Sequence, residues 1–114
     1  MPIIEKKKSE SGFPGVDRSE IVNVELGACS LTVGDVILSP GSSVPIHFHP
    51  TEEAMVILEG ELEATLGDVT TTVVPGQTVL APAGVKHGLV NRTGSNARLM
   101  AIFPTDKVER TFVD

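Results

Sequence analysis

The chain's three histidines are the side chains most able to support chemistry. His47 and His49 are separated by one residue in a stretch rich in β-forming residues, so in a strand both imidazoles leave the same face. Pro50-Thr51 then predicts a turn, which brings Glu53 onto the next antiparallel strand beside the two rings. Imidazole and carboxylate together suit a divalent transition metal, although His-x-His alone is also compatible with packed or surface histidines.

These residues lie within two longer motifs, and there the sequence resembles the cupin superfamily. The first motif has its fixed positions at Gly41, His47, His49, Glu53 and Gly60. The second has them at Gly76, Pro82, Gly84, His87 and Asn91, and residues 61–75 separate the two. Ten fixed positions at about 5% usage each coincide by chance about once in 10¹³ sequences, so the match is not accidental.

The resemblance implies a fold, a cofactor and a ligand set. The fold is an antiparallel double-stranded β-helix, or jelly-roll barrel. The cofactor is one divalent transition metal per chain (Fe, Mn, Ni, Zn or Cu), held by His47, His49, Glu53 and His87. Four protein ligands on an octahedral ion leave two positions for a substrate, and Glu53 is the candidate acid/base.

Composition independently predicts an all-β protein. Val, Ile and Thr supply 32 of the 114 residues, interrupted by 11 glycines and 8 prolines, and no stretch keeps a helical apolar period. We expect one domain over residues 1–114. It would comprise an arm with the first strand (1–28), the barrel core (29–104) and a tail (105–114).

The strands can be placed approximately. A loop is expected over residues 9–20, followed by strands at 21–26, 30–38, 44–49, 53–58, 61–66, 69–74, 78–81, 87–91 and 98–103. The Gly67-Asp68 pair predicts a two-residue hairpin turn. This turn pairs Leu66 with Val69, Ala64 with Thr71, and Leu62 with Val73.

Ala54–Leu58 is apolar on both alternating faces, so both faces should be covered. One face would line the barrel, and the other needs the N-terminal arm or a second subunit, which predicts a homodimer. The single cysteine, Cys29, is expected to be a small buried residue rather than a reactive thiol.

Charge and hydropathy exclude several partners. The net charge of −6 and the pI near 4.9 argue against nucleic acid, and the basic run Lys6–Lys8 is too short to change this. The longest uncharged apolar run is only five residues, so no membrane span is expected. Without a signal-peptide pattern the expected location is cytoplasmic, and the expected partner is a small molecule.

The function predicted from the quartet is a metal-dependent enzyme on a small oxygen-bearing metabolite, with dioxygenase-type chemistry favoured. The alternatives are a sugar or keto-sugar isomerase, and a non-catalytic module that binds a small ligand or senses metal. A second ionisable group facing the metal would favour an enzyme. The candidates are Arg18, Gln77, Lys86, Arg92 and Arg98, whereas Asn91 is expected to serve a turn.

Overall fold

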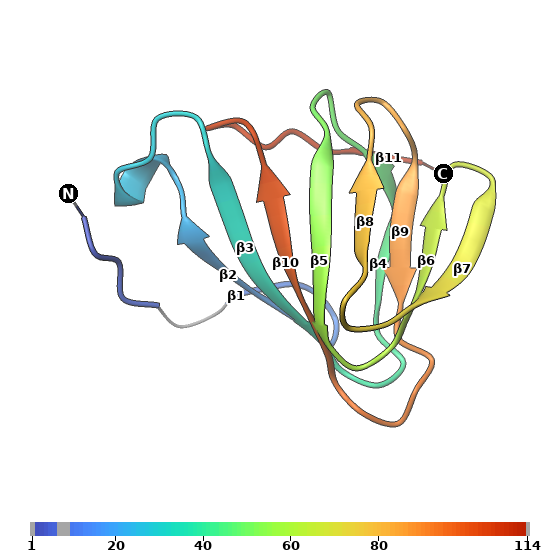
Figure 1. The fold of residues 1–114 in the computed structure, drawn as a ribbon. Helices are drawn as coiled ribbons and strands as arrows, with labels where there is room; N and C mark the ends of the chain where they lie inside the picture. The colour runs from blue at the N-terminus through green and yellow to red at the C-terminus, as the bar shows by residue number, and fades with distance from the viewer. Residues whose placement is uncertain (1, 7–9, 114) are drawn as a thin grey trace.

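The computed structural model describes residues 2–6 and 10–113, and in that part nearly all regular structure is antiparallel β-sheet (Figure 1). One sheet has six strands in the order β1-β2-β3-β10-β5-β8, and the other has five in the order β11-β4-β9-β6-β7. The elements are β1 (Glu10–Phe13), β2 (Val16–Val22), η1 (Val24–Leu26), β3 (Thr32–Leu38), β4 (Ser43–Phe48), β5 (Glu53–Glu59), β6 (Leu62–Leu66), β7 (Val69–Val73), β8 (Thr78–Ala81), β9 (His87–Val90), β10 (Ala97–Phe103) and β11 (Thr111–Phe112).

The core lies between the two sheets because one face of each strand is apolar. In β10 the buried residues alternate strictly with half-buried ones, so Leu99 and Phe103 point inward while Arg98 and Met100 point outward. Leu38, Ile57 and Leu62 join the inward set with almost no exposed surface. The expected all-β jelly-roll class is therefore confirmed, although hydrogen bonds do not join the two sheets into one closed barrel.

The predicted hairpin is confirmed residue by residue. β6 and β7 pair Leu62 with Val73, Ala64 with Thr71, and Leu66 with Val69. Gly67 has φ +61°, the conformation that the first position of this turn requires. The other predicted strands from 30 to 103 also form, with ends displaced by at most two residues.

The N-terminal prediction was wrong in two places. Where a loop was expected over residues 9–20, β1 and β2 form a hairpin around Pro14-Gly15; residue 9 lies outside the described part. Where a strand was expected at 21–26, the chain leaves β2 and forms η1. Asn23 caps this turn, its Oδ1 accepting a hydrogen bond from the Leu26 amide at 3.0 Å.

The outer face of the six-stranded sheet carries an ion cluster around one buried carboxylate. Asp35 accepts hydrogen bonds from Arg98 Nε and Nη2, both at 2.9 Å, and from Lys6 Nζ at 2.7 Å. Lys6 thus ties the described part of the N-terminal arm to the sheet, whereas Lys7 and Lys8 of the basic run lie outside the described residues.

The rest of that outer face is apolar and only partly covered. Val56 is half-buried there, while Leu58 and Leu80 are 38% and 54% exposed. Cys29 is exposed as well, so its predicted burial was wrong; it lies in the connection between η1 and β3 rather than in a strand of the core. No helix in the described residues is long and apolar enough to span a bilayer.

Candidate metal centre

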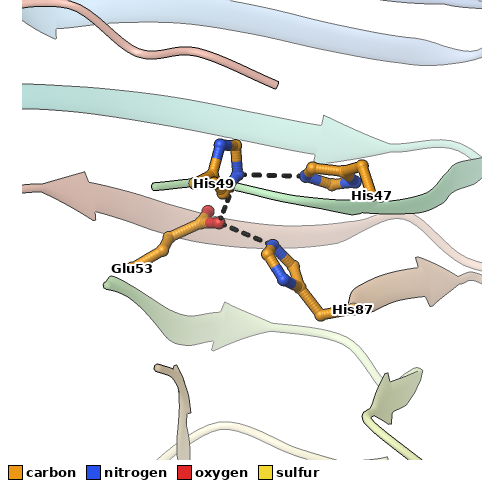
Figure 2. Close-up of side chains that lie close together, drawn as sticks. All are labelled: His47, His49, Glu53 and His87. Atoms are coloured by element: carbon orange, nitrogen blue, oxygen red, sulfur yellow. Dashed lines mark hydrogen bonds and ion pairs between the residues drawn. The ribbon is translucent and has the colours of Figure 1, made fainter. Parts of the chain in front are cut away.

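Three strand ends bring the predicted ligands together (Figure 2). His47 is on β4 and His49 follows it, while Glu53 begins β5 and His87 begins β9. Antiparallel pairing of β4 with β9 places His47 directly opposite His87. All four side chains are buried, with 2% to 5% of each residue exposed, and one ligand atom from each lies within 4.8 Å of the others.

Glycines in the motifs allow the close approach of these segments. The Gly84 amide donates to the carbonyl of His49 at 2.8 Å and ties the loop before His87 to the end of β4. At Gly88 an added Cβ would lie 2.8 Å from Ile46 Cδ1 and 2.9 Å from the Val44 carbonyl oxygen. Glycine therefore fits best where β9 lies against β4, which explains why Gly88 follows His87.

Each histidine is oriented by a backbone carbonyl. Nδ1 of His47 donates to Pro45 O at 2.7 Å, Nδ1 of His87 to Val85 O at 3.0 Å, and Nδ1 of His49 to Glu109 O at 2.8 Å. Because a carbonyl can only accept, Nδ1 carries the proton in all three rings. In the neutral form, Nε2 is then the free nitrogen, and it faces the centre of the cluster.

The Nε2 atoms and the carboxylate fit a metal ion better than they fit one another. His47 Nε2 is 3.1 Å from His49 Nε2, and Glu53 Oε1 is 3.1 Å from His49 Nε2 and 2.9 Å from His87 Nε2 (Figure 2). Lone pairs this close repel unless a proton or a cation lies between them. Ligand atoms each about 2.1 Å from an ion and at right angles around it are about 3 Å apart, so the spacing suits a six-coordinate ion.

The electrostatics of the cluster point the same way. Burial raises the pKa of Glu53, but the contacts with His49 and His87 outweigh it, so the pKa lies below its ordinary value. For His87, burial lowers the pKa, but the hydrogen bonds to Glu53 and to the Val85 carbonyl raise it by more, so the pKa lies above its ordinary value. Burial dominates at His47 and lowers its pKa. Glu53 is thus a carboxylate, and a metal ion at the cluster would compete with the proton that the Glu53 contact favours on His87.

A cavity of about 360 Å³ opens beside the cluster, and His47, Glu53 and His87 form part of its wall. Most of the remaining wall is apolar. It includes Val36, Met55, Leu89, Leu99 and Phe103 from the strands, and Phe13 and Phe112 from the chain's two end segments. Such a mainly apolar cavity with a few convergent polar groups is typical of a small-molecule site.

Of the five candidate polar residues, Arg18 alone lines this cavity. Gln77 accepts a hydrogen bond from the Val74 amide, and Lys86 is exposed. Arg92 pairs with Glu63 at 2.9 Å, and Arg98 is engaged with Asp35 outside the cavity. Asn91 holds its turn as predicted, with Nδ2 donating to Leu38 O and Ser95 O and Oδ1 accepting from Thr93.

Sequence analysis missed a second arginine of the cavity. Arg110 reaches the wall because β11 pairs with the edge of β4, with Phe112 opposite His47. A two-residue strand beyond the motifs gives no periodicity to detect, so no sequence signal pointed to Arg110.

The chain belongs to the cupin family, since the family model for the cupin domain matches residues 34–103. A curated relative, "Polyketide synthase CurC" of Streptomyces cyaneus, is 31% identical over 84 residues. That alignment covers 73% of this chain and 54% of the relative, so the chain spans little more than half of that protein's length.

Solved structures agree on the fold. The polyketide cyclase RemF from Streptomyces resistomycificus superposes with a TM-score of 0.78 at 27% identity, covering 97% of this chain and 82% of RemF. An oxalate oxidase gives a TM-score of 0.80 at 23% identity, covering 94% of this chain and 60% of that one. At that identity the oxalate oxidase supports the fold only.

Proposed function

We propose that this protein is a metal-dependent enzyme that acts on a small oxygen-bearing metabolite, with dioxygenase-type chemistry as the leading subclass. The observation that carries the proposal is the convergence of His47, His49, Glu53 and His87 beside a mainly apolar cavity, whose wall includes all of them except His49. A divalent ion bound there supplies Lewis acidity and, if it is a redox metal, electron exchange with dioxygen.

The protein's own groups prepare this chemistry. The three backbone carbonyls fix the imidazole tautomers, so no reorientation is needed when an ion binds. Glu53 is ionised and touches the cavity, so it is the group placed to take a proton from a bound substrate. The apolar wall excludes water and favours a substrate with a hydrophobic body over a sugar, because sugar hydroxyls would need polar partners.

A second candidate is non-redox chemistry on an enolisable substrate, such as ring closure. Two observations favour it: the similarity to the polyketide cyclase RemF over nearly the whole chain, and the apolar lining of the cavity. Here Lewis acidity alone is sufficient, and no dioxygen is consumed.

Exchange of the metal separates the candidates. Protein loaded with Fe(II) or with Zn(II) is incubated with a panel of keto acids, diketones, thiols and uronates while oxygen and substrate are followed. Dioxygenase chemistry predicts oxygen consumption with Fe(II) and none with Zn(II), because zinc does not exchange electrons. Turnover with both metals and no oxygen uptake supports the second candidate. If no metal form turns over any compound, a non-catalytic binding or metal-sensing role replaces both.

Two further expectations belong to the same proposal. A homodimer would cover the apolar outer face around Val56, Leu58 and Leu80, which the single chain leaves partly exposed. A cytoplasmic location stays a prediction, which cell fractionation tests.

A further inference from the structure

Two arginine side chains line the cavity beside the histidine cluster, and neither donates a hydrogen bond to a described carboxylate. Arg18 comes from β2 of the six-stranded sheet, and Arg110 from the segment that leads into β11 of the five-stranded sheet. Both lie near the same aromatic ring, with Cζ atoms 5.9 and 6.0 Å from the ring centroid of Phe103. His49 of the cluster packs edge-on against that ring, at 4.9 Å between ring centroids.

Arg18 provides the stronger evidence for a bound anion. Its Nε and Nη2 atoms are buried and have no hydrogen-bond partner. Among the described residues, Glu20 forms an ion pair with Arg18, with Oε2 3.6 Å from Nη2, which is too long for a hydrogen bond, while Glu20 Oε1 accepts from Asn23 Nδ2. Buried polar atoms without hydrogen-bond partners are rare and costly, so this guanidinium edge is suited to binding a ligand.

Another arginine of the protein shows which ligand the Nε–Nη2 edge of a guanidinium group can bind. Arg98 uses the same two atoms, Nε and Nη2, to grip both oxygens of Asp35 at 2.9 Å each. This side-on, bidentate geometry is the one in which arginine recognises a carboxylate. The fold also leaves room for Arg18: β3 has glycine at position 34, where a Cβ would lie 3.3 Å from Arg18 Nε.

Arg110 adds a second positive charge. It is half-buried, and its guanidinium group makes no hydrogen bond or ion pair with another residue in the part of the chain that the structure describes. In a protein of net charge −6, the described lining residues of the cavity thus include two arginines and one carboxylate, Glu53. A divalent ion at the cluster would make that cavity still more positive.

We infer that the substrate is an anion with an apolar body, and that Arg18 and Arg110 bind its carboxylate while its oxygen-bearing end faces the histidine cluster. The inference deepens the proposed function. Only the placement of the oxygen-bearing end at the histidine cluster rests on that function, because the arginines can select a carboxylate whether or not an ion is bound. The apolar wall accounts for the body, and the two guanidinium groups account for the charge.

The test uses one matched pair of probes on the Zn(II)-loaded protein, which does not exchange electrons with dioxygen. The acid 2,4-dioxo-4-phenylbutanoate and its methyl ester share the phenyl ring and the enolisable diketone, and differ in the charged carboxylate. Isothermal titration should show the acid binding the unchanged protein about 10 to 100 times more tightly than the ester, the range expected for charge-assisted hydrogen bonds. Equal affinities overturn the inference without any variant.

Variants then show which groups recognise the charge. Arg18→Gln and Arg110→Gln should each weaken acid binding about tenfold or more and leave the ester within about twofold. Arg92→Gln is the matched control, since it removes the same charge from an exposed arginine outside the cavity. If the Arg18→Gln/Arg110→Gln double variant keeps the full preference for the acid, the metal rather than the arginines binds the carboxylate, and the inference is wrong.

Metal content, measured by elemental analysis on the same samples, keeps the two proposals apart. If the wild-type protein takes up no metal but still binds the acid more tightly than the ester, the metal-dependent function is refuted and the anion site is supported. Protein that holds one ion per chain but binds acid and ester alike refutes the anion site and leaves the metal-dependent function standing. Circular dichroism of each variant checks that the fold is retained.

Discussion

His49 and Glu109 are sixty residues apart in sequence, yet the Nδ1 of His49 donates a 2.8 Å hydrogen bond to the backbone carbonyl of Glu109. The segment that follows pairs with β4, through Thr111 opposite Phe48 and Phe112 opposite His47. The last described residues therefore hold one histidine of the cluster in place and build one wall of the cavity. They are part of the site rather than a loose tail.

Removing residues 109–114 should accordingly weaken metal binding about 10 to 100-fold, the usual effect of losing a hydrogen bond that orients a ligand. Competition against a chromophoric chelator measures it. Glu109→Ala is the control and should bind metal normally, because the contact is made by the main chain. Undiminished metal affinity in the shortened protein would show that His49 does not need this carbonyl.

The second prediction concerns the metal itself. We expect about one divalent ion per chain, and His47→Ala or His87→Ala should abolish tight binding. An ion present at about 100 times its dissociation constant stabilises the folded state by about 2.7 kcal/mol, which raises the melting temperature by roughly 10 °C for a domain of this size. Lys86→Ala, beside His87 but exposed, should keep the full shift. A melting temperature that changes neither when metal is removed by a chelator nor when it is added back would refute the prediction.

The third prediction uses the buried carboxylate of Asp35. Hydrogen bonds from Arg98 lower its pKa below the ordinary value; burial opposes them, and the hydrogen bond from Lys6 adds to them. The folded chain therefore binds this proton less readily than the unfolded chain does. The stabilisation is present above the unfolded pKa, about 3.9, and is lost as the pH falls through the lower folded value.

Asp35→Asn should lower the free energy of unfolding by about 1–3 kcal/mol near pH 7, since it removes charged hydrogen bonds of a buried group. Urea titrations at a series of pH values provide the test. The difference in unfolding free energy between the two proteins should narrow as the pH falls below about 4, where Asp35 of the unfolded chain takes up its proton before Asp35 of the folded chain does. A gap that stays constant down to the lowest pH would contradict the assignment.

The fourth prediction concerns assembly. If the outer face of β5 joins two chains, Val56→Arg places a charge in that interface and should convert dimer to monomer. Light scattering at micromolar concentration reads out the mass, about 12 kDa for a single chain. Thr72→Arg, on the exposed face of β7 in the other sheet, should leave the mass unchanged. A single-chain mass for the unmodified protein removes the dimer altogether.

Local patterns predicted what local physics determines. The turn at Gly67-Asp68 fixed the β6–β7 register. The spacing of His47, His49 and Glu53 correctly brought them together at the ends of consecutive strands, but the expected antiparallel pairing of those strands was wrong, because β4 and β5 lie in different sheets. In both cases the signal lies within a few residues and follows from side-chain alternation. His87 was placed by the family resemblance, because its pairing with His47 joins segments far apart in the chain.

What sequence missed depends on contacts between distant segments. β2 is polar where Arg18 faces the cavity and where Ser19 is buried, so its pattern suggested a loop. Neither Arg110 nor the Glu109 carbonyl carries any mark of its role, since only the docking of β11 on β4 brings them to the site. Edge strands held by a few backbone hydrogen bonds lack the apolar alternation that reveals central ones.

The last prediction concerns Glu53, a buried residue whose ionised carboxylate is shared between His49 and His87. Glu53→Gln keeps an oxygen at the cluster but removes both the negative charge and the proton acceptor. Metal affinity should fall at least about tenfold, and turnover with metal saturated should fall about 10² to 10⁴-fold if Glu53 is the base. Glu52→Gln, which alters its exposed neighbour, should change neither quantity. Full turnover by the Glu53→Gln variant at saturating metal would show that Glu53 is a ligand only, and that another group takes the proton.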